Sequence, residues 1–201
     1  MGRVQTFDTD EVVRAVRALF WDRGFEDVSV PEIEIATGLR RSSLYHAFGS
    51  KRGLFDAAVQ SYLDEVIRPR LRPLAGPGVQ PGALLDYLHG LRAVFADGRV
   101  PALQSGCLLL NAATAPIGRE PEIADVVLGY RRELHAAMAR GVAAHAPSSS
   151  AEDQDRLARV CAALVVSAMV LARVDTDEAA RTMDAAVGLV QDARSPQAGS
   201  A

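Results

Sequence analysis

Residues 29–51 read SVPEIEIATGLRRSSLYHAFGSK, and this stretch decides the fold of the N-terminal part of the chain. Ser29 and Glu32 have the S-x-x-E spacing of a capping box, so a helix is predicted to start there, with Pro31 in its first turn. Gly38 predicts the end of this helix, because glycine readily adopts the positive φ of a helix C-terminus. A second short helix follows. Helix, glycine turn and helix together are typical of a helix-turn-helix motif.

The second helix of this motif has an apolar and a polar face. Leu44 and Phe48 are four residues apart and are predicted to point inward. The side chains left on the outer face are polar or basic: Arg40, Arg41, Ser42, Ser43, Tyr45 and His46. The segment from Leu39 to Phe55 has no acidic residue and contains the cations Arg40, Arg41, Lys51 and Arg52. A local basic face of this kind predicts contact with DNA.

The segment resembles the DNA-binding domain of the tetracycline-repressor (TetR) family of bacterial regulators. The matching residues lie on both sides of the turn: Leu19-Phe20, Gly24-Phe25, Ile33, Ala36, Thr37-Gly38-Leu39, Ser43-Leu44-Tyr45, Phe48, Lys51 and Leu54-Phe55. The resemblance covers about the first quarter of the chain. Glu34 departs from it, since many relatives carry a small alanine there. By its helical position Glu34 is expected to point outward or toward the first helix.

The resemblance implies that the second helix enters the major groove of DNA. Its first residues are then the candidates for contact with base edges or nearby phosphates: Arg40, Arg41, Ser42 and Ser43. The groups expected to grip phosphates are Ser29, Tyr45, His46 and Lys51. Two alternatives stay open at this point: Tyr45 as a core aromatic residue, and His46 as a surface residue without a role.

Composition narrows the class of protein. The 201-residue chain has a net charge of −3 and is 49% hydrophobic, which suits one or two globular domains. The longest apolar run, residues 160–172, is shorter than the ~20 residues that a membrane span needs. The N-terminus lacks a secretion signal, so a cytoplasmic protein without a membrane partner is expected. The histidines, cysteines and glycines have no spacing typical of a catalytic, metal or cofactor site, so we predict no enzyme, metal or cofactor.

Helical spacing continues through the rest of the chain, and an all-α fold of about nine helices is predicted. The fourth helix is expected to run from Ser50 to about Arg68, before Pro69. Further helices are expected at about 82–97, 101–115, 120–145, 151–174 and 177–192. The predicted domains are a helix-turn-helix domain at 1–55, a helical ligand-binding and dimerisation domain at 56–192, and a disordered tail at 193–201.

Polar residues are scattered along the middle helices. The resemblance implies a pocket for a small effector there, and the candidate lining residues are Tyr87, His89, Arg92, Cys107, Asn111 and Tyr130. Each of them could instead be a core polar group bonded to backbone or water. Cys107 as a redox sensor is a weaker option, because no basic cluster lies next to it in the sequence.

Two stripes with a spacing of three and four residues mark the last two helices. They contain Leu157, Val160 or Cys161, Leu164, Ala168 and Leu171 on the first helix, and Ala179, Met183, Ala186 and Val190 on the second. These stripes predict a four-helix interface in a homodimer, or packing within the core of the same subunit.

Together these features predict a dimeric DNA-binding regulator. It is expected to act as a repressor on a pseudo-palindromic double-stranded operator and to be released by a small-molecule effector. The alternative is a helical protein that binds a small molecule or a protein partner without specific DNA binding.

Overall fold

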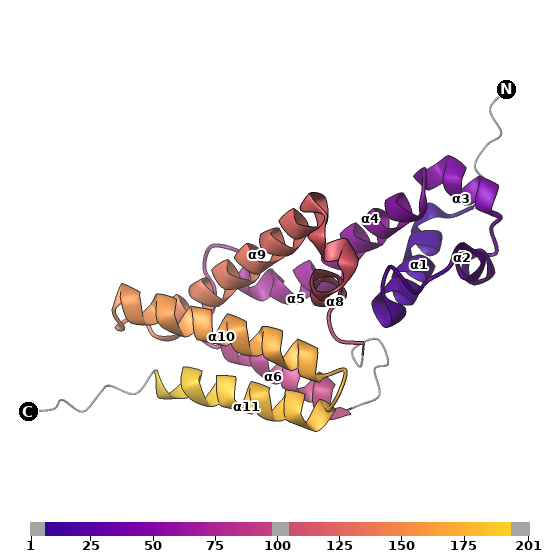
Figure 1. Cartoon of the computed structure of the whole chain (residues 1–201). Coiled ribbons are helices and arrows are strands. Elements are labelled where there is room, and N and C mark those ends of the chain that lie inside the picture. The colour runs from indigo at the N-terminus through magenta and orange to yellow at the C-terminus, as the bar shows by residue number, and fades with distance from the viewer. Residues whose placement is uncertain (1–6, 98–104, 194–201) are drawn as a thin grey trace, which may run out of the picture.

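A computed structural model describes residues 7–97 and 105–193, and within these two stretches helices are joined by turns and loops, with no strand. A head of short helices lies at one end, and a fourth helix leads from it into a body of longer helices (Figure 1). The all-α prediction is therefore confirmed. In the described residues no helix is long and apolar enough to cross a membrane.

The head consists of α1 (Thr9–Arg23), α2 (Val30–Thr37) and α3 (Arg41–Phe48). Asp8 caps α1 by accepting from the backbone N–H groups of Asp10 and Glu11. Gly38 lies between α2 and α3 with a φ of 67°, the left-handed conformation that the turn requires. The helices enclose a core of fully buried side chains: Val16, Phe20, Ile33 and Leu44.

The helix after the head is longer than predicted. It begins with α4 (Lys51–Tyr62), continues through a π-helical segment η1 (Leu63–Ile67) into α5 (Arg68–Leu71), and ends in a 3₁₀ turn η2 (Arg72–Leu74). The predicted end at Arg68 is wrong. Proline normally breaks a helix, because it removes one hydrogen bond and its ring clashes with the preceding turn. Here the wider π-helical turn lies directly before Pro69, so the chain stays helical past it.

The body contains α6 (Ala83–Asp97), α8 (Leu108–Thr114), η3 (Pro116–Arg119), α9 (Pro121–His145), α10 (Ala151–Leu171) and α11 (Thr176–Asp192). The main packing pairs are α6 with α11, α11 with α10, and α10 with α9 (Figure 1). The predicted start of a helix at 101 and the tail from 194 to 201 lie outside the described residues. The boundary predicted at residue 55 falls inside α4, whose main partner in the head is α1.

The two stripes that predicted a dimer interface pack mostly within the subunit. The fully buried members are Cys161, Ala168, Ala179, Met183, Ala186 and Val190. Of the stripe residues, Val160 is exposed, and Leu157, Leu164 and Leu171 are half-buried. Side chains on the neighbouring faces are exposed instead: Val170, Val174 and Leu189. The spacing identified the buried face of these helices, and of the two alternatives the structure agrees with packing within the same subunit, because α6 and α9 cover this face.

Candidate nucleic-acid interface

The outer face of α3 carries the polar side chains that the sequence singled out. Leu44 is fully buried and anchors the helix in the head. The side chains on the opposite face are exposed: Arg40, Arg41, Ser42, Ser43 and His46. Tyr45 is half-buried and also packs against the core of the head. A helix held by one buried leucine presents a basic, hydrogen-bonding surface that a major groove can accept.

Arg41 and Tyr45 form a stacked pair on this face. The guanidinium carbon of Arg41 lies 4.9 Å from the ring centroid of Tyr45. A cation above an aromatic face is attracted to it, and a stacked guanidinium keeps its N–H groups free at its edges. The ring therefore holds Arg41 in place while its donors remain available to a base or a phosphate.

Glu34 contacts the start of the reading helix. Its side chain accepts a hydrogen bond of 2.6 Å from the backbone N–H of Arg41. Glu34 is half-exposed, and its carboxylate lies toward α3 because the turn at Gly38 brings the first residue of α3 back beside α2.

The four cations predicted to form one basic patch have three different surroundings. Lys51 places its ammonium 4.5 Å from the Phe25 ring centroid, and burial there lowers the pKa of its amine. Arg52 forms ion pairs with Asp56, Glu120 and Glu122. Arg40 and Arg41 remain exposed. Two of the acids paired with Arg52, Glu120 and Glu122, lie at the start of α9. They are far from Arg52 in the sequence, so the local pattern could not reveal them.

Ser29 is engaged in the predicted capping box of α2. Its backbone N–H and its hydroxyl donate to the Glu32 carboxylate at 2.8 and 2.6 Å, and Arg23 pairs with the same carboxylate. These hydrogen bonds lower the pKa of Glu32 to about 2. The amino end of α2 is thereby tied to Arg23 at the end of α1.

The structure brings three of the six predicted ligand residues close enough to interact, Tyr87, Cys107 and Tyr130, and places the other three elsewhere. Tyr87 lines an open cavity of about 700 Å³ between α5 and α6, together with Pro69, Arg70, Asp86 and Leu91. His89 and Arg92 are exposed on the surface of α6, and Arg92 pairs with Asp184 of α11 at 3.0 Å. Of the six predicted ligand residues, Tyr87 is the one that lines this cavity.

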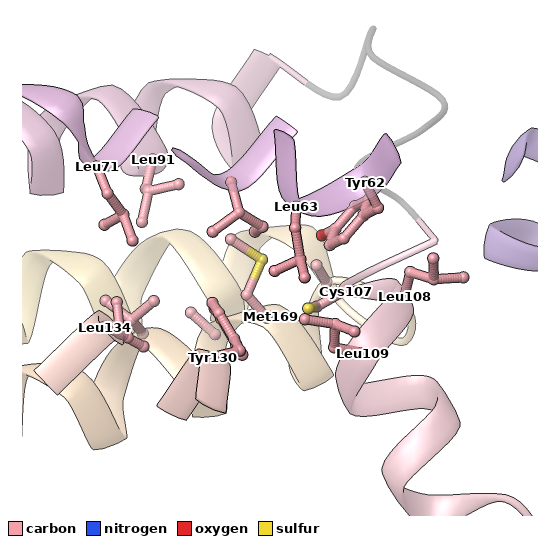
Figure 2. Close-up of a cluster of buried hydrophobic side chains, with 14 of the residues drawn as sticks. Tyr62, Leu63, Leu71, Leu91, Cys107, Leu108, Leu109, Tyr130, Leu134 and Met169 are labelled. Atoms are coloured by element: carbon pink, nitrogen blue, oxygen red, sulfur yellow. The ribbon is translucent and has the colours of Figure 1, made fainter. Parts of the chain in front are cut away.

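Cys107 and Tyr130 belong to a cluster of buried side chains within the body (Figure 2). The Cys107 thiol interacts with the hydroxyl groups of Tyr62 and Tyr130. Burial raises the pKa of the thiol and of both phenols, so all three stay protonated at neutral pH. A protonated, buried thiol is a poor nucleophile.

Asn111 ties the head to the body. Its amide donates to the backbone oxygens of Ser105 at 2.8 Å and of Trp21 at 3.4 Å. Trp21 in turn donates from its indole N–H to the Gly106 oxygen at 3.0 Å. Arg173, which follows α10, donates to the Ser105 oxygen at 2.9 Å and to the Asp22 oxygen at 3.4 Å. The sequence gives no signal for this junction, because its partners are up to 151 positions apart.

Comparison with known proteins identifies the family. The model for bacterial regulatory proteins of the tetR family matches residues 12–58. YezE of Bacillus subtilis (strain 168), an uncharacterised HTH-type transcriptional regulator, is 32% identical over 143 residues, which are 71% of this chain and 72% of YezE. The HTH-type transcriptional repressor ComR of Escherichia coli (strain K12) is 29% identical over 63% of this chain and 59% of its own length.

A solved structure matches almost the whole chain. The TetR-family transcriptional regulator CifR, as a cysteine mutant complexed with a 26-bp operator DNA, is 28% identical with a TM-score of 0.74. The match covers 92% of this chain and 98% of CifR. Sequence and fold agree over the head and the body, and the chain therefore belongs to the tetR family of bacterial regulatory proteins.

Proposed function

We propose that this chain is a transcriptional repressor that binds a pseudo-palindromic operator as a homodimer and leaves it when a small-molecule effector binds. The observation that carries the proposal is the outer face of α3, where Arg40 and Arg41 stand exposed above the buried Leu44. A repressor of the family, ComR, and a family member in complex with operator DNA, CifR, support it. Since operator DNA lies in the cytoplasm of a bacterium, we place the protein there, and we assign it no reaction.

In this proposal α3 lies in the major groove and Arg41 reads a guanine. The planar guanidinium can donate two parallel hydrogen bonds to the O6 and N7 atoms of guanine. Arg40, Ser42 and Ser43 lie beside it for a further base or for the nearest phosphates. Tyr45, His46, Lys51 and Ser29 contact phosphates, and Lys51 reaches them by moving its ammonium from the Phe25 ring.

A dimer supplies the second reading head. Exposed apolar side chains follow one face of α10 and continue onto α11: Val160, Val170, Val174 and Leu189. Ala163, Ser167 and Ala185 are exposed among them and are small enough to allow two helices to approach closely. Apolar side chains of this size lose contact with water when a second copy covers them, which favours a four-helix interface.

The cavity beside α5 is the proposed effector site. Pro69 and Arg70 come from α5, which is continuous with α4 and hence with the head, and Tyr87 and Leu91 come from α6. An effector that binds between them changes the position of α5 relative to α6. Because α4 packs against α1, such a change alters the spacing of the two heads.

The test is a selection of duplex DNA by the full-length protein from a randomised library. The proposal expects an enriched two-fold symmetric sequence, bound at least a hundredfold more tightly than random duplex, and a dimeric mass in light scattering. The alternative function, a helical carrier without specific DNA binding, requires that no sequence is enriched. A monomer at micromolar concentration would overturn the interface on α10 and α11.

A further inference from the structure

The reading helix α3 lacks the features that normally start a helix. Its N-cap residue is Arg40, whose side chain makes no capping bond, and its first turn contains no acid. Arg40 and Arg41 also place positive charge at the positive end of the helix dipole, which is unfavourable. By its own sequence α3 is therefore a poorly initiated helix of eight residues.

Four other helices of the chain are capped by the side chain of their own N-cap residue. Side chains of the N-cap residues accept from the first turn at Asp8, Ser50, Ser150 and Asp175. In α3 the corresponding acceptor comes from the preceding helix, because the Glu34 carboxylate takes the N–H of Arg41, the first residue of α3. The cap thus bridges α2 and α3 across the turn at Gly38.

We infer that Glu34 positions the reading helix and raises the selectivity of operator binding, an inference that rests on the proposed function. The hydrogen bond fixes where α3 starts and how it is oriented against α2, and it holds the backbone of the Arg41 residue. A defined orientation favours contacts with base edges, which tolerate little displacement, over contacts with phosphates, which tolerate more.

The charge of Glu34 also raises the selectivity of operator binding. The carboxylate lies at the DNA-facing end of α3, where it offsets part of the attraction of Arg40 and Arg41 for phosphates. Non-specific binding depends almost entirely on that attraction, whereas specific binding also gains from base contacts. One side chain therefore strengthens operator binding through geometry and weakens random binding through charge.

Two substitutions separate these effects. Glu34→Ala removes both the acceptor and the charge, whereas Glu34→Gln keeps an acceptor oxygen and removes the charge alone. Asp125→Asn is the matched control, because Asp125 is an exposed acid on α9 and its substitution changes the net charge by the same amount. Affinities for the selected operator and for random duplex are measured at two salt concentrations, together with the melting temperature of each variant.

The inference expects Glu34→Ala to bind the operator about tenfold more weakly, the size of one lost helix cap, and to bind random duplex a few-fold more tightly at low salt. Glu34→Gln is expected to show the same gain on random duplex but to keep most of the operator affinity. Asp125→Asn is expected to change neither.

Three outcomes overturn the inference. In the first, the Glu34 variants bind the operator and random duplex as tightly as the parent does. In the second, both affinities fall together with the melting temperature, as expected for a purely structural role. If Glu34→Ala does not fold, Glu34→Gln decides, and an unchanged affinity for random duplex contradicts the role of the charge. A parent protein that does not prefer its selected DNA instead overturns the proposed function itself.

Discussion

Two sides of the head use arginine in opposite ways. On the α3 side, Arg40 and Arg41 are exposed, and Arg41 is supported by an aromatic ring. On the side that faces the body, Arg52 of α4 pairs with Glu120 and Glu122. The same residue type is a candidate DNA contact in one place and a structural tie in the other. The tertiary partners, and not the residue type, determine which role each arginine has.

The two sides also differ in how closely neighbouring segments of the chain approach each other. The α3 side is an open surface. On the body side, Gly106 has a φ of 70°, and a side-chain carbon there would lie 2.6 Å from the Met169 oxygen. Because Gly106 also accepts from the Trp21 indole, this close approach connects the head to α10.

The largest expected effect is a substitution that breaks the junction. Gly106→Ala forces a side chain into a positive-φ position and against the Met169 oxygen, and we expect it to lower the free energy of unfolding by about 3 kcal/mol. Urea denaturation followed by circular dichroism measures the change. Gly38→Ala is the control, since Gly38 has a φ of 67° but open space around it, and it should cost about 1 kcal/mol. Equal losses at the two glycines would contradict the close approach at the junction.

The next prediction separates the arginines of the two sides. Arg41→Ala should weaken operator binding by about 1–3 kcal/mol and relax the preference at one base pair, because a bidentate contact to guanine is lost. Arg52→Ala should leave operator affinity within about twofold, since its charge is already balanced by three acids. Binding titrations against the selected operator and its single-base variants provide both numbers. A similar loss for the two variants would show that Arg52 belongs to the interface.

The sequence predicted the head well because its signals are local. A capping box at Ser29, a left-handed turn at Gly38 and the inward spacing of Leu44 each depend on residues within a few positions of one another. The start of α1 also depends on a local signal, because Asp8 accepts from the backbone N–H groups of Asp10 and Glu11. Family membership, carried by residues of this segment, is likewise confirmed.

The body was predicted less well because its functional groups depend on distant partners. Helix periodicity located α9, α10 and α11, but it could not tell which apolar face meets another helix of the same subunit. The surroundings of the predicted ligand residues likewise depend on distant partners. Tyr87 faces a cavity, whereas Asn111 is used by the junction and Arg92 by an ion pair with Asp184. The assigned roles of the DNA contacts stay predictions that the substitutions above can test.

A smaller effect is expected at Lys51, which lies between the two sides. Lys51→Met keeps the apolar stem over Phe25 and removes the charge. If the ammonium contacts a phosphate in the complex, the slope of log affinity against log salt should fall by about 0.9. Fluorescence anisotropy at four salt concentrations gives the slope, with Arg92→Met on α6 as a control far from α3. An unchanged slope would assign Lys51 to the packing of the head alone.

The smallest effect concerns the cap of α2, on the α3 side. The Ser29 hydroxyl, Arg23 and the Ser29 N–H hold the pKa of Glu32 at about 2 in the folded chain, below its ordinary value of 4.5. A lowered folded-state pKa gives stability that is fully present above pH 4.5 and is lost as the pH falls from 4.5 toward 2. Glu32→Gln should therefore be less stable than the parent at pH 7, and the difference should shrink below pH 4.5.

Urea unfolding of both proteins between pH 7 and pH 3 measures this difference, and 0.5 M salt should reduce it, because the pair with Arg23 is exposed to solvent. Glu122→Gln is a suitable control, since that carboxylate is highly exposed and its distance to Arg52 is 3.9 Å. A difference that stays constant over the whole pH range would mean that Glu32 acts by packing and not by charge. The cap of α2 would then contribute through its shape, and the Glu34 carboxylate on the Arg41 N–H would remain the charged contact that holds α3.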